Sequence, residues 1–264
     1  MSTQPSAPNL SVIAPGLEYR DGIWSAKTPA AISYPDSGNA ECYALEDDSF
    51  WFQHRNRSLL TLMKKFPPPG QLFDIGGGNG YQAKLFQESG LAVTLLEAGV
   101  EGVQHAQQRG VKELICSTLE QAQFLPGTLP AVGVFDVVEH IEDDQTFLQQ
   151  LHTVIQPAGR LYVTVPAYQW LWSNEDVRAG HFRRYTIRSL SKRLHQAGFT
   201  IEYASYLFSP LPLPILIGRR FFKKLSSPKQ HHSKADWLGF EIALLRLGWR
   251  IPFGSSCVIV ARKI

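Results

Sequence analysis

The chain has 264 residues, of which 44% are hydrophobic and 19% are charged. This composition is ordinary for a globular protein and excludes a disordered, collagen-like or coiled-coil chain. Cys42, Cys116 and Cys257 lie far apart, so they predict neither a disulfide framework nor a close-spaced zinc site. The sequence has no apolar run of about 18 residues, and its first residues lack a signal-peptide pattern. These features predict a cytoplasmic protein.

The net charge of +3 hides a strong separation along the chain. Residues 1–177 hold 10 basic and 20 acidic residues, whereas residues 178–234 hold 12 basic residues and only one acid, Glu202. Such a separation predicts a basic face that meets a phosphorylated metabolite, acidic lipid headgroups or nucleic acid. A solvated basic face beside the acidic half of the molecule is the alternative. The sequence has no recognisable nucleic-acid-binding module, so we expect no nucleic acid partner.

Residues 1–48 are predicted to form a partly ordered arm, because Pro, Ser, Ala and Gly dominate there. A helix is predicted over residues 49–66 and ends before the string Pro67 to Gly70. From residue 71 onward, apolar segments of strand length alternate with amphipathic segments of helix length. The predicted strands are 71–75, 91–97, 112–116, 129–138, 160–166, 200–207 and 255–262. This alternation predicts an α/β fold with a mostly parallel sheet and helices on both faces.

Two of the predicted helices carry clear end signals. Asp143 and Asp144 are expected to cap the helix over residues 144–156. Thr186 is the expected N-cap of the next helix, and Gly198 lies just past its end.

A glycine-rich turn, DIGGGNG at residues 74–80, follows the first strand of the predicted sheet. Glycines let the backbone approach a ligand closely, and the amides at the start of the following helix favour an anionic group. A dinucleotide site would want Gly or Ala at Tyr81, and Asp74 would repel a pyrophosphate. The ammonium and carboxylate of S-adenosyl-L-methionine would suit both Asp74 and the amides. An NAD-dependent oxidoreductase is the alternative reading.

Acidic residues also end the second and fourth predicted strands. Glu97 is placed to accept both hydroxyls of a ribose. The string FDVVEHI at residues 135–141 has the pattern acid-x-x-Glu-His. Together with DIGGGNG, these strings resemble class I S-adenosylmethionine-dependent methyltransferases, in the small-molecule branch that contains ubiquinone-biosynthesis type enzymes. The resemblance covers about residues 50–206 and the final strand near residues 256–262.

The resemblance implies a Rossmann-like, seven-stranded, mostly parallel sheet whose last strand is antiparallel. It implies a lid helix at the start of a methyltransferase core over residues 49–206, with the final core strand at 255–264. S-adenosyl-L-methionine is the implied cofactor. The residues expected to bind it are Asp74, Gly76, Gly78, Gly80, Glu97, Thr118, Leu119, Phe135 and Asp136. The family usually has Gly-Asp-Ala where this chain has Ser117-Thr118-Leu119, so a hydroxyl replaces the carboxylate near the adenine.

Residues 207–254 form a basic and aromatic insertion between the last two strands. Apolar residues beside the string RRFFKK predict either a substrate cap or a peripheral membrane contact through residues 207–225. Both alternatives are compatible with the charge pattern.

Methyl transfer from a sulfonium needs positioning, and it needs a base only when the acceptor must lose a proton. His140 and His181 are the candidate bases, with structural histidines as the alternative. Glu139, His140, Asp143 and Asp144 could suggest a metal, but Asp143 and Asp144 are expected to cap a helix, so no metal is predicted. The expected substrate-binding residues are Trp51, Arg57, Arg183, Arg184 and Tyr185. On the lid helix, Arg57 or Arg55 could also meet the cofactor carboxylate, and an ordinary amphipathic helix is the alternative for these residues.

The sequence therefore predicts a methyltransferase that acts on a small acceptor, which is anionic or lipid-linked. A non-catalytic protein that binds S-adenosylmethionine is a further alternative, because Thr118 replaces the usual carboxylate.

Overall fold

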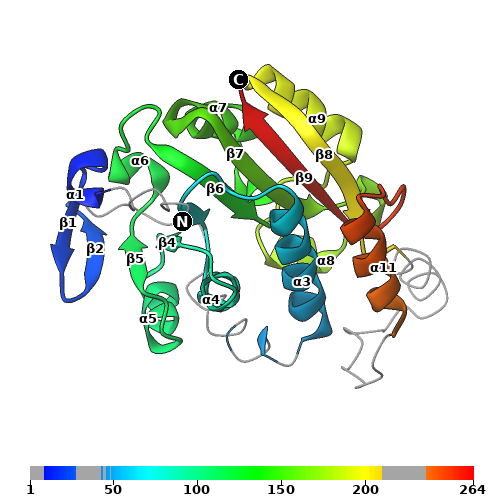
Figure 1. The fold of residues 1–264 in the computed structure, drawn as a ribbon, viewed down its shortest axis with the longest axis horizontal. Coiled ribbons are helices and arrows are strands. Elements are labelled where there is room, and N and C mark those ends of the chain that lie inside the picture. The colour runs from blue at the N-terminus through cyan, green and yellow to red at the C-terminus, as the bar shows by residue number, and fades with distance from the viewer. Residues whose placement is uncertain (1–8, 28–42, 44–45, 48, 210–235) are drawn as a thin grey trace, which may run out of the picture.

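The computed structural model describes residues 9–27, 43, 46–47, 49–209 and 236–264. A nine-stranded sheet forms the centre of the molecule, with the order β1-β2-β5-β4-β3-β6-β7-β9-β8 (Figure 1). The strands are β1 (Leu17–Arg20), β2 (Ile23–Ala26), β3 (Leu72–Ile75), β4 (Val93–Glu97), β5 (Glu113–Cys116), β6 (Leu129–Phe135), β7 (Ile155–Pro166), β8 (Phe199–Leu207) and β9 (Ser256–Lys263).

Helices connect the strands and lie on both faces of the sheet. The α-helices are α1 (Leu10–Ile13), α3 (Phe50–Lys65), α4 (Tyr81–Glu88), α5 (Val100–Gln108), α6 (Leu119–Ala122), α7 (Asp144–Val154), α8 (Asn174–Arg178), α9 (Ile187–Gln196) and α11 (Asp236–Leu247). Short 3-10 helices, η1 (Val138–His140) and η2 (Gln169–Leu171), follow β6 and β7.

Strands β3 to β9 correspond to the seven predicted strands, and the mostly parallel α/β fold is confirmed. Strand β3 pairs in parallel with β4 and β6, while β9 runs antiparallel to both β7 and β8. The strand order reverses direction at β3. Ligands of such sheets bind beyond the carboxyl ends of the strands at this point.

The predicted count of seven strands is corrected to nine, because residues 17–26 form a hairpin. Trp24 and Ser25 of β2 pair in parallel with Ile115 and Cys116 of β5. The two strands are only four residues long, so their alternation is too short to stand out from the sequence around them. The turn Asp21-Gly22, with φ values of 50° and 85°, is a hairpin signal that the arm prediction did not use.

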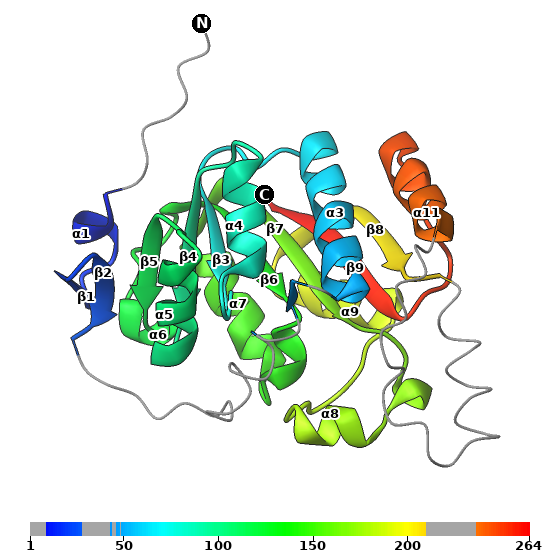
Figure 2. The same ribbon diagram turned by 90° about the horizontal axis from the view of Figure 1, so that it is seen from below.

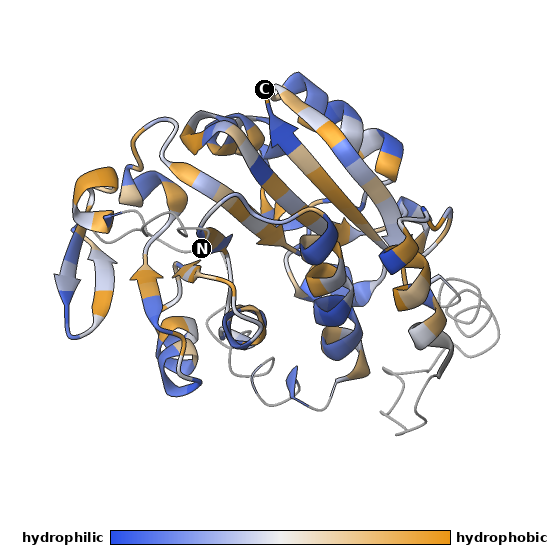
Figure 3. Cartoon of the chain, in the orientation of Figure 1, coloured by the Kyte–Doolittle hydropathy of each residue, from blue (hydrophilic) through white to orange (hydrophobic). Residues whose placement is uncertain are grey.

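Two hydrophobic cores lie on opposite faces of the sheet. One core holds Leu148 and Leu151 of α7 together with Leu190 and Leu194 of α9. The other core buries residues of α3, α4, α5 and α11. Figure 2 shows α3, α4 and α11 on one side of the sheet, and Figure 3 shows the apolar residues along the central strands.

The predicted caps Asp143 and Thr186 are confirmed, whereas Asp144 is the first residue of α7 and its buried carboxylate pairs with Arg183 and Arg193 instead. The backbone N–H of Thr146 donates to the Asp143 carboxylate over 3.0 Å, and the N–H of Ser189 donates to the Thr186 hydroxyl over 3.1 Å. Residues 210–235, which hold most of the predicted membrane-contacting segment, lie outside the described part of the chain. Among the described helices, none combines the length and apolar character needed to cross a lipid bilayer.

Candidate functional site

The glycine turn leaves β3 at the point where the sheet reverses its strand order. Gly76, Gly78 and Gly80 have φ values of 72°, 53° and 74°, which residues with a side chain rarely adopt. A Cβ atom at Gly76 would lie 2.7 Å from Val137 Cγ2, and one at Gly80 would lie 2.6 Å from Ala106 Cβ. The sequence therefore needs glycine here both for the backbone conformation and for close packing.

Asp74 lies buried beneath this turn. It is 1% exposed, and its Oδ2 atom has no hydrogen-bond partner among the described residues. Burial raises the pKa of Asp74 to about 7, with Glu97 adding to the shift and Arg55 opposing it. A buried carboxylate without a donor is costly unless a cation or donor joins it. The ammonium group of S-adenosyl-L-methionine is such a partner, so the residues present fit this cofactor.

Glu97 ends the neighbouring strand β4 and faces the same turn. Its Oε2 accepts the N–H of Gly78 over 3.0 Å, and its Oε1 accepts the N–H of Gly99 over 2.7 Å. Burial raises the pKa of Glu97, while these backbone hydrogen bonds oppose the increase. Glu97 thus ties the glycine turn to the start of α5, and its predicted contact with the ribose stays a prediction.

Asp136 follows β6 with a φ of 57°, an unusual conformation for a residue other than glycine. Its carboxylate pairs with Arg55 of α3 over 2.5 Å and accepts the Thr164 hydroxyl over 3.0 Å. Arg55 is buried, whereas Arg57 is exposed. Helix α3, the predicted lid, therefore contacts Asp136 through Arg55, the second of the two arginines that the sequence offered for the cofactor carboxylate.

The residues after β5 mainly support helix α6. The Thr118 hydroxyl accepts the N–H of Gln121 over 3.2 Å, and the Gln121 side chain accepts the N–H of Thr118. This reciprocal capping box is visible in the sequence as Thr-x-x-Gln. Leu119 and Phe135 are buried, and the Phe135 ring packs against Phe86. The predicted adenine and methionine contacts of Thr118, Leu119 and Phe135 remain predictions.

His140 and His181, which are 41 positions apart in sequence, lie together beyond β6. Their ring centroids are 4.6 Å apart. Burial, and next the nearby His181, lower the pKa of His140 to about 4, so its imidazole is neutral at pH 7. Burial raises the pKa of Glu139 well above its usual value, and Asp136 adds to this shift.

Glu139, His140 and His181 offer one ligand atom each, and these atoms lie within 4.8 Å of one another. Such a set could hold a divalent cation. The set that the sequence offered was Glu139, His140, Asp143 and Asp144, and the structure joins His181 to the first two instead. The prediction that no metal binds is not tested by this geometry.

His181 is oriented by a residue that the sequence analysis missed. Its Nδ1 atom lies 2.8 Å from Asp176 Oδ1, and Asp176 is only 1% exposed. Arg184 donates to both oxygens of the same carboxylate, over 2.7 and 3.0 Å. The spacing Ser173-x-x-Asp176 is a capping-box pattern that could have placed Asp176 at the start of α8.

The other predicted substrate residues have partners within the protein. Arg183 donates to the carbonyl oxygens of Ile141 and Glu142, while the Tyr185 hydroxyl donates to Asp144 over 2.7 Å. Tyr185 is 2% exposed, so its polar atom lies inside the molecule. These contacts hold the loop around His181 in place, and a direct contact of Arg183, Arg184 or Tyr185 with substrate remains a prediction.

Trp51, the last of these candidates, packs within the protein. Its ring stacks on Phe208, with centroids 3.7 Å apart. A substrate contact for Trp51, or for the exposed Arg57, also remains a prediction.

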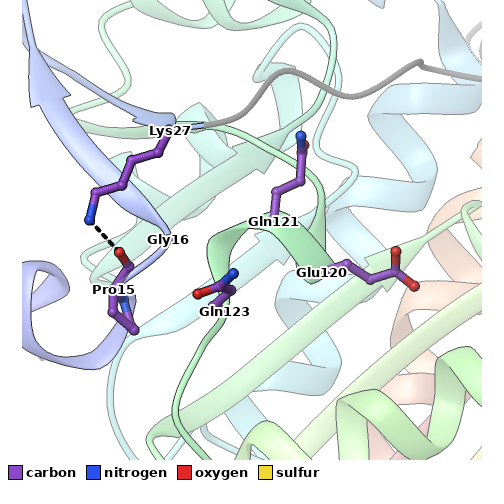
Figure 4. A pocket seen from close by; sticks show the side chains of 6 residues that line it. All are labelled: Pro15, Gly16, Lys27, Glu120, Gln121 and Gln123. Atoms are coloured by element: carbon purple, nitrogen blue, oxygen red, sulfur yellow. Dashed lines mark hydrogen bonds between the residues drawn. The ribbon is translucent and has the colours of Figure 1, made fainter.

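A separate surface pocket lies between the N-terminal hairpin and α6 (Figure 4). It is lined by Pro15, Gly16, Lys27, Glu120, Gln121 and Gln123. The Lys27 ammonium donates to the Pro15 carbonyl over 2.6 Å, as the dashed line shows. This pocket contains none of the acids at the strand ends, so we assign it no part in the chemistry.

Comparisons with known proteins indicate the family of the chain. A family model described as a methyltransferase domain matches residues 48–204, which is more than half of the chain. A probable S-adenosylmethionine-dependent methyltransferase from Mycolicibacterium smegmatis is 23% identical over 66% of this chain and 68% of its own length. A ubiquinone biosynthesis O-methyltransferase from Pectobacterium carotovorum is 31% identical over 35% of this chain and 41% of its own length. The matched part thus spans less than half of that enzyme.

Solved structures support the fold. A phosphoethanolamine N-methyltransferase 2 from Haemonchus contortus, in complex with S-adenosyl-L-methionine, superposes with a TM-score of 0.58. It is 18% identical, and the match covers 91% of this chain and 61% of that one. The chain therefore belongs to the methyltransferase domain family and is a class I methyltransferase that uses S-adenosyl-L-methionine.

Proposed function

We propose that the protein transfers the methyl group of S-adenosyl-L-methionine to a hydroxyl of a small acceptor, which is anionic or lipid-linked. The observation that carries this proposal is the pair His181–Asp176 beside His140. A hydroxyl is a weak nucleophile until a base takes its proton, whereas the cofactor supplies an already activated methyl group.

Asp176 orients His181 for this role. The Asp176 carboxylate accepts the Nδ1–H of His181, which leaves the Nε2 lone pair of the imidazole free to take a proton. Burial acts to raise the pKa of Asp176, but hydrogen bonds from Arg184 and His181 outweigh it and lower that pKa. Asp176 therefore stays ionised at neutral pH and stabilises the imidazolium that forms when His181 takes the proton.

His140 has a different part in the same site. Its pKa of about 4 makes it a poor base at pH 7, so we assign it the role of a neutral hydrogen-bonding group for the acceptor. The choice of oxygen as the accepting atom is supported by the relatives named as O-methyltransferases.

Two observations support the acceptor class. Residues 178–234 carry 12 basic residues against one acid, which suits an anionic acceptor. Arg183 and Arg184 already bind protein groups, so the attraction would come from the wider basic surface. The apolar and basic residues of the 207–225 segment suit a lipid-linked acceptor and a peripheral membrane contact, in a protein located in the cytoplasm.

The test uses labelled S-adenosyl-L-methionine and four acceptors: a phenol, its carboxylated form, its polyprenylated form and a primary amine of similar size. We expect label in the phenols, with the carboxylated or polyprenylated form preferred. His181→Gln should lower kcat about 100-fold without changing cofactor affinity. His195→Gln, at an exposed histidine of α9, is the matched control and should keep full activity.

Methylation of the amine alone, or full activity in His181→Gln, would contradict the proposal. Binding of S-adenosylhomocysteine without turnover on any acceptor would favour the non-catalytic alternative. Binding of NAD, measured by calorimetric titration, would favour an oxidoreductase.

A further inference from the structure

Arg109, just past the end of α5, contacts three of the described residues that precede α3. Its guanidinium pairs with Glu46 over 3.1 Å and with Asp47 over 2.9 Å. The same group lies over the rings of Tyr43 and Tyr81, at 4.6 and 5.1 Å from their centroids. Tyr43, Glu46 and Asp47, which we call the strap, are thus held against the helices α4 and α5.

The two ion pairs of Arg109 differ strongly in their surroundings. The side chains of Arg109 and Glu46 are each 10% exposed, whereas that of Asp47 is 71% exposed. A solvent-exposed ion pair contributes little, but removing one partner of a buried pair leaves an uncompensated charge. The Arg109–Glu46 contact is therefore the one that holds the strap in place.

Glu46 also reaches the glycine turn. Asn79, which is 1% exposed and lies between Gly78 and Gly80, donates from Nδ2 to Glu46 Oε1 over 3.4 Å. The Oδ1 atom of Asn79 accepts a hydrogen bond from His105 Nδ1 over 2.9 Å, and the His105 ring stacks on Tyr43 at 4.0 Å. Asn79 lies between two glycines that have left-handed φ values. It is thus held by hydrogen bonds to both the strap and α5.

We propose that Arg109 is a positioning residue for the cofactor: through Glu46 and Asn79 it holds the glycine turn in its binding conformation. A backbone in sparsely populated φ regions persists only where its surroundings fix it. Glu97 ties the other side of the same turn to the start of α5, so both ends of the turn depend on this helix. When the Arg109–Glu46 contact is lost, the turn samples other conformations, and the cofactor must bind a less populated state.

The experiment compares Glu46→Gln with Asp47→Asn, since both remove one negative charge from the same arginine. The measurement is the affinity for S-adenosylhomocysteine by calorimetric titration. We expect about a 10-fold loss for Glu46→Gln and less than a 2-fold loss for Asp47→Asn. Arg109→Ala should lose at least as much as Glu46→Gln, and Arg109→Lys should recover part of the loss. In the double variant, Glu46→Gln should add almost nothing to Arg109→Ala.

Readouts beyond affinity separate positioning from general stability. We expect the KM for the cofactor to rise with little change in the KM for the acceptor. Equal effects of Glu46→Gln and Asp47→Asn, or a lower melting temperature with unchanged cofactor affinity, would overturn the proposal. If Arg109→Ala fails to fold, the Glu46 and Asp47 variants still decide it. Since the proposal rests on the cofactor site, failure of that assignment would appear as absent binding in the unmodified protein.

Discussion

Two buried aspartates in this molecule differ in the hydrogen-bond partners of their carboxylate oxygens. Asp74 and Asp176 are each 1% exposed. Within the described part of the chain, one oxygen of Asp74 has no hydrogen-bond partner, and the pKa of Asp74 is raised to about 7. Both oxygens of Asp176, in contrast, accept hydrogen bonds from Ser173, His181 or Arg184. The carboxylate on the proposed acceptor side is therefore held by the protein itself, while we expect the carboxylate on the proposed cofactor side to be completed by a cationic ligand.

The strongest test of this difference is a substitution in the glycine turn. Gly78→Val places a branched side chain in the glycine turn at a residue whose φ is 53°. We expect at least a 100-fold loss of affinity for S-adenosylhomocysteine. Gly90→Val is the matched control, because Gly90 also has a positive φ and a Cβ there would meet no atom within 4 Å. Both variants should lose about 1–2 kcal/mol of stability, but only Gly78→Val should lose binding. Equal affinities of the two variants for S-adenosylhomocysteine would contradict the assignment of the glycine turn to the cofactor site.

Asp74→Asn should have opposite effects on binding and stability. The neutral amide can accept a hydrogen bond from an ammonium group but cannot balance its charge, so we expect cofactor affinity to fall about 30-fold. The same change removes a costly buried charge, so the melting temperature of the ligand-free protein should rise at pH 7.5. Asp176→Asn should lower the melting temperature, because it breaks hydrogen bonds that are already made. Melting curves that shift in the same direction would contradict the comparison.

The pH dependence gives a smaller but independent effect. The folded pKa of Asp74, about 7, lies above its usual value of 3.8, so the ligand-free protein should lose stability as pH rises between these values. The lowered pKa of Asp176 has the opposite effect on stability. The ionised carboxylate stabilises the folded protein at neutral pH, and this stability is lost as pH falls below the usual aspartate pKa of 3.8.

A cationic ligand favours the ionised form of Asp74. The affinity for S-adenosylhomocysteine should therefore rise about 10-fold from pH 6 to pH 8 and then level off. Titration in buffers of different ionisation enthalpy should reveal proton release on binding. The pH profile measured with Asp74→Asn should be flat over this range, and a slope that persists in the variant would assign the proton to another group.

The smallest expected effect is that of a metal chelator. If His181 acts as a base, chelation should leave the methyl-transfer rate within about 2-fold of its starting value. Loss of activity that Mg²⁺ or Zn²⁺ restores would show instead that Glu139, His140 and His181 bind a cation. In that case the acceptor side, like the cofactor side, would be completed by a ligand.

The sequence predicted most of the sheet because its strands are apolar segments of ordinary length with glycine or proline at their ends. Asp74, Glu97 and Asp136 were predictable because strand ends of a parallel sheet meet at one place. The Arg109–Glu46 pair was not, since its partners are 63 positions apart and no local pattern joins them. The hairpin Leu17–Ala26 offered only its turn Asp21-Gly22 as a signal, because its strands are too short for a periodic pattern.

That hairpin has a consequence for how the protein behaves in concentrated solution. Without β2, one side of β5 would present unpaired backbone N–H and C=O groups, a template on which another chain can add a strand. Strand β1, with the charged residues Glu18 and Arg20, now takes the outermost position and resists such pairing. We therefore expect the hairpin Leu17–Ala26 to limit self-association through the sheet edge, a task distinct from any step of methyl transfer.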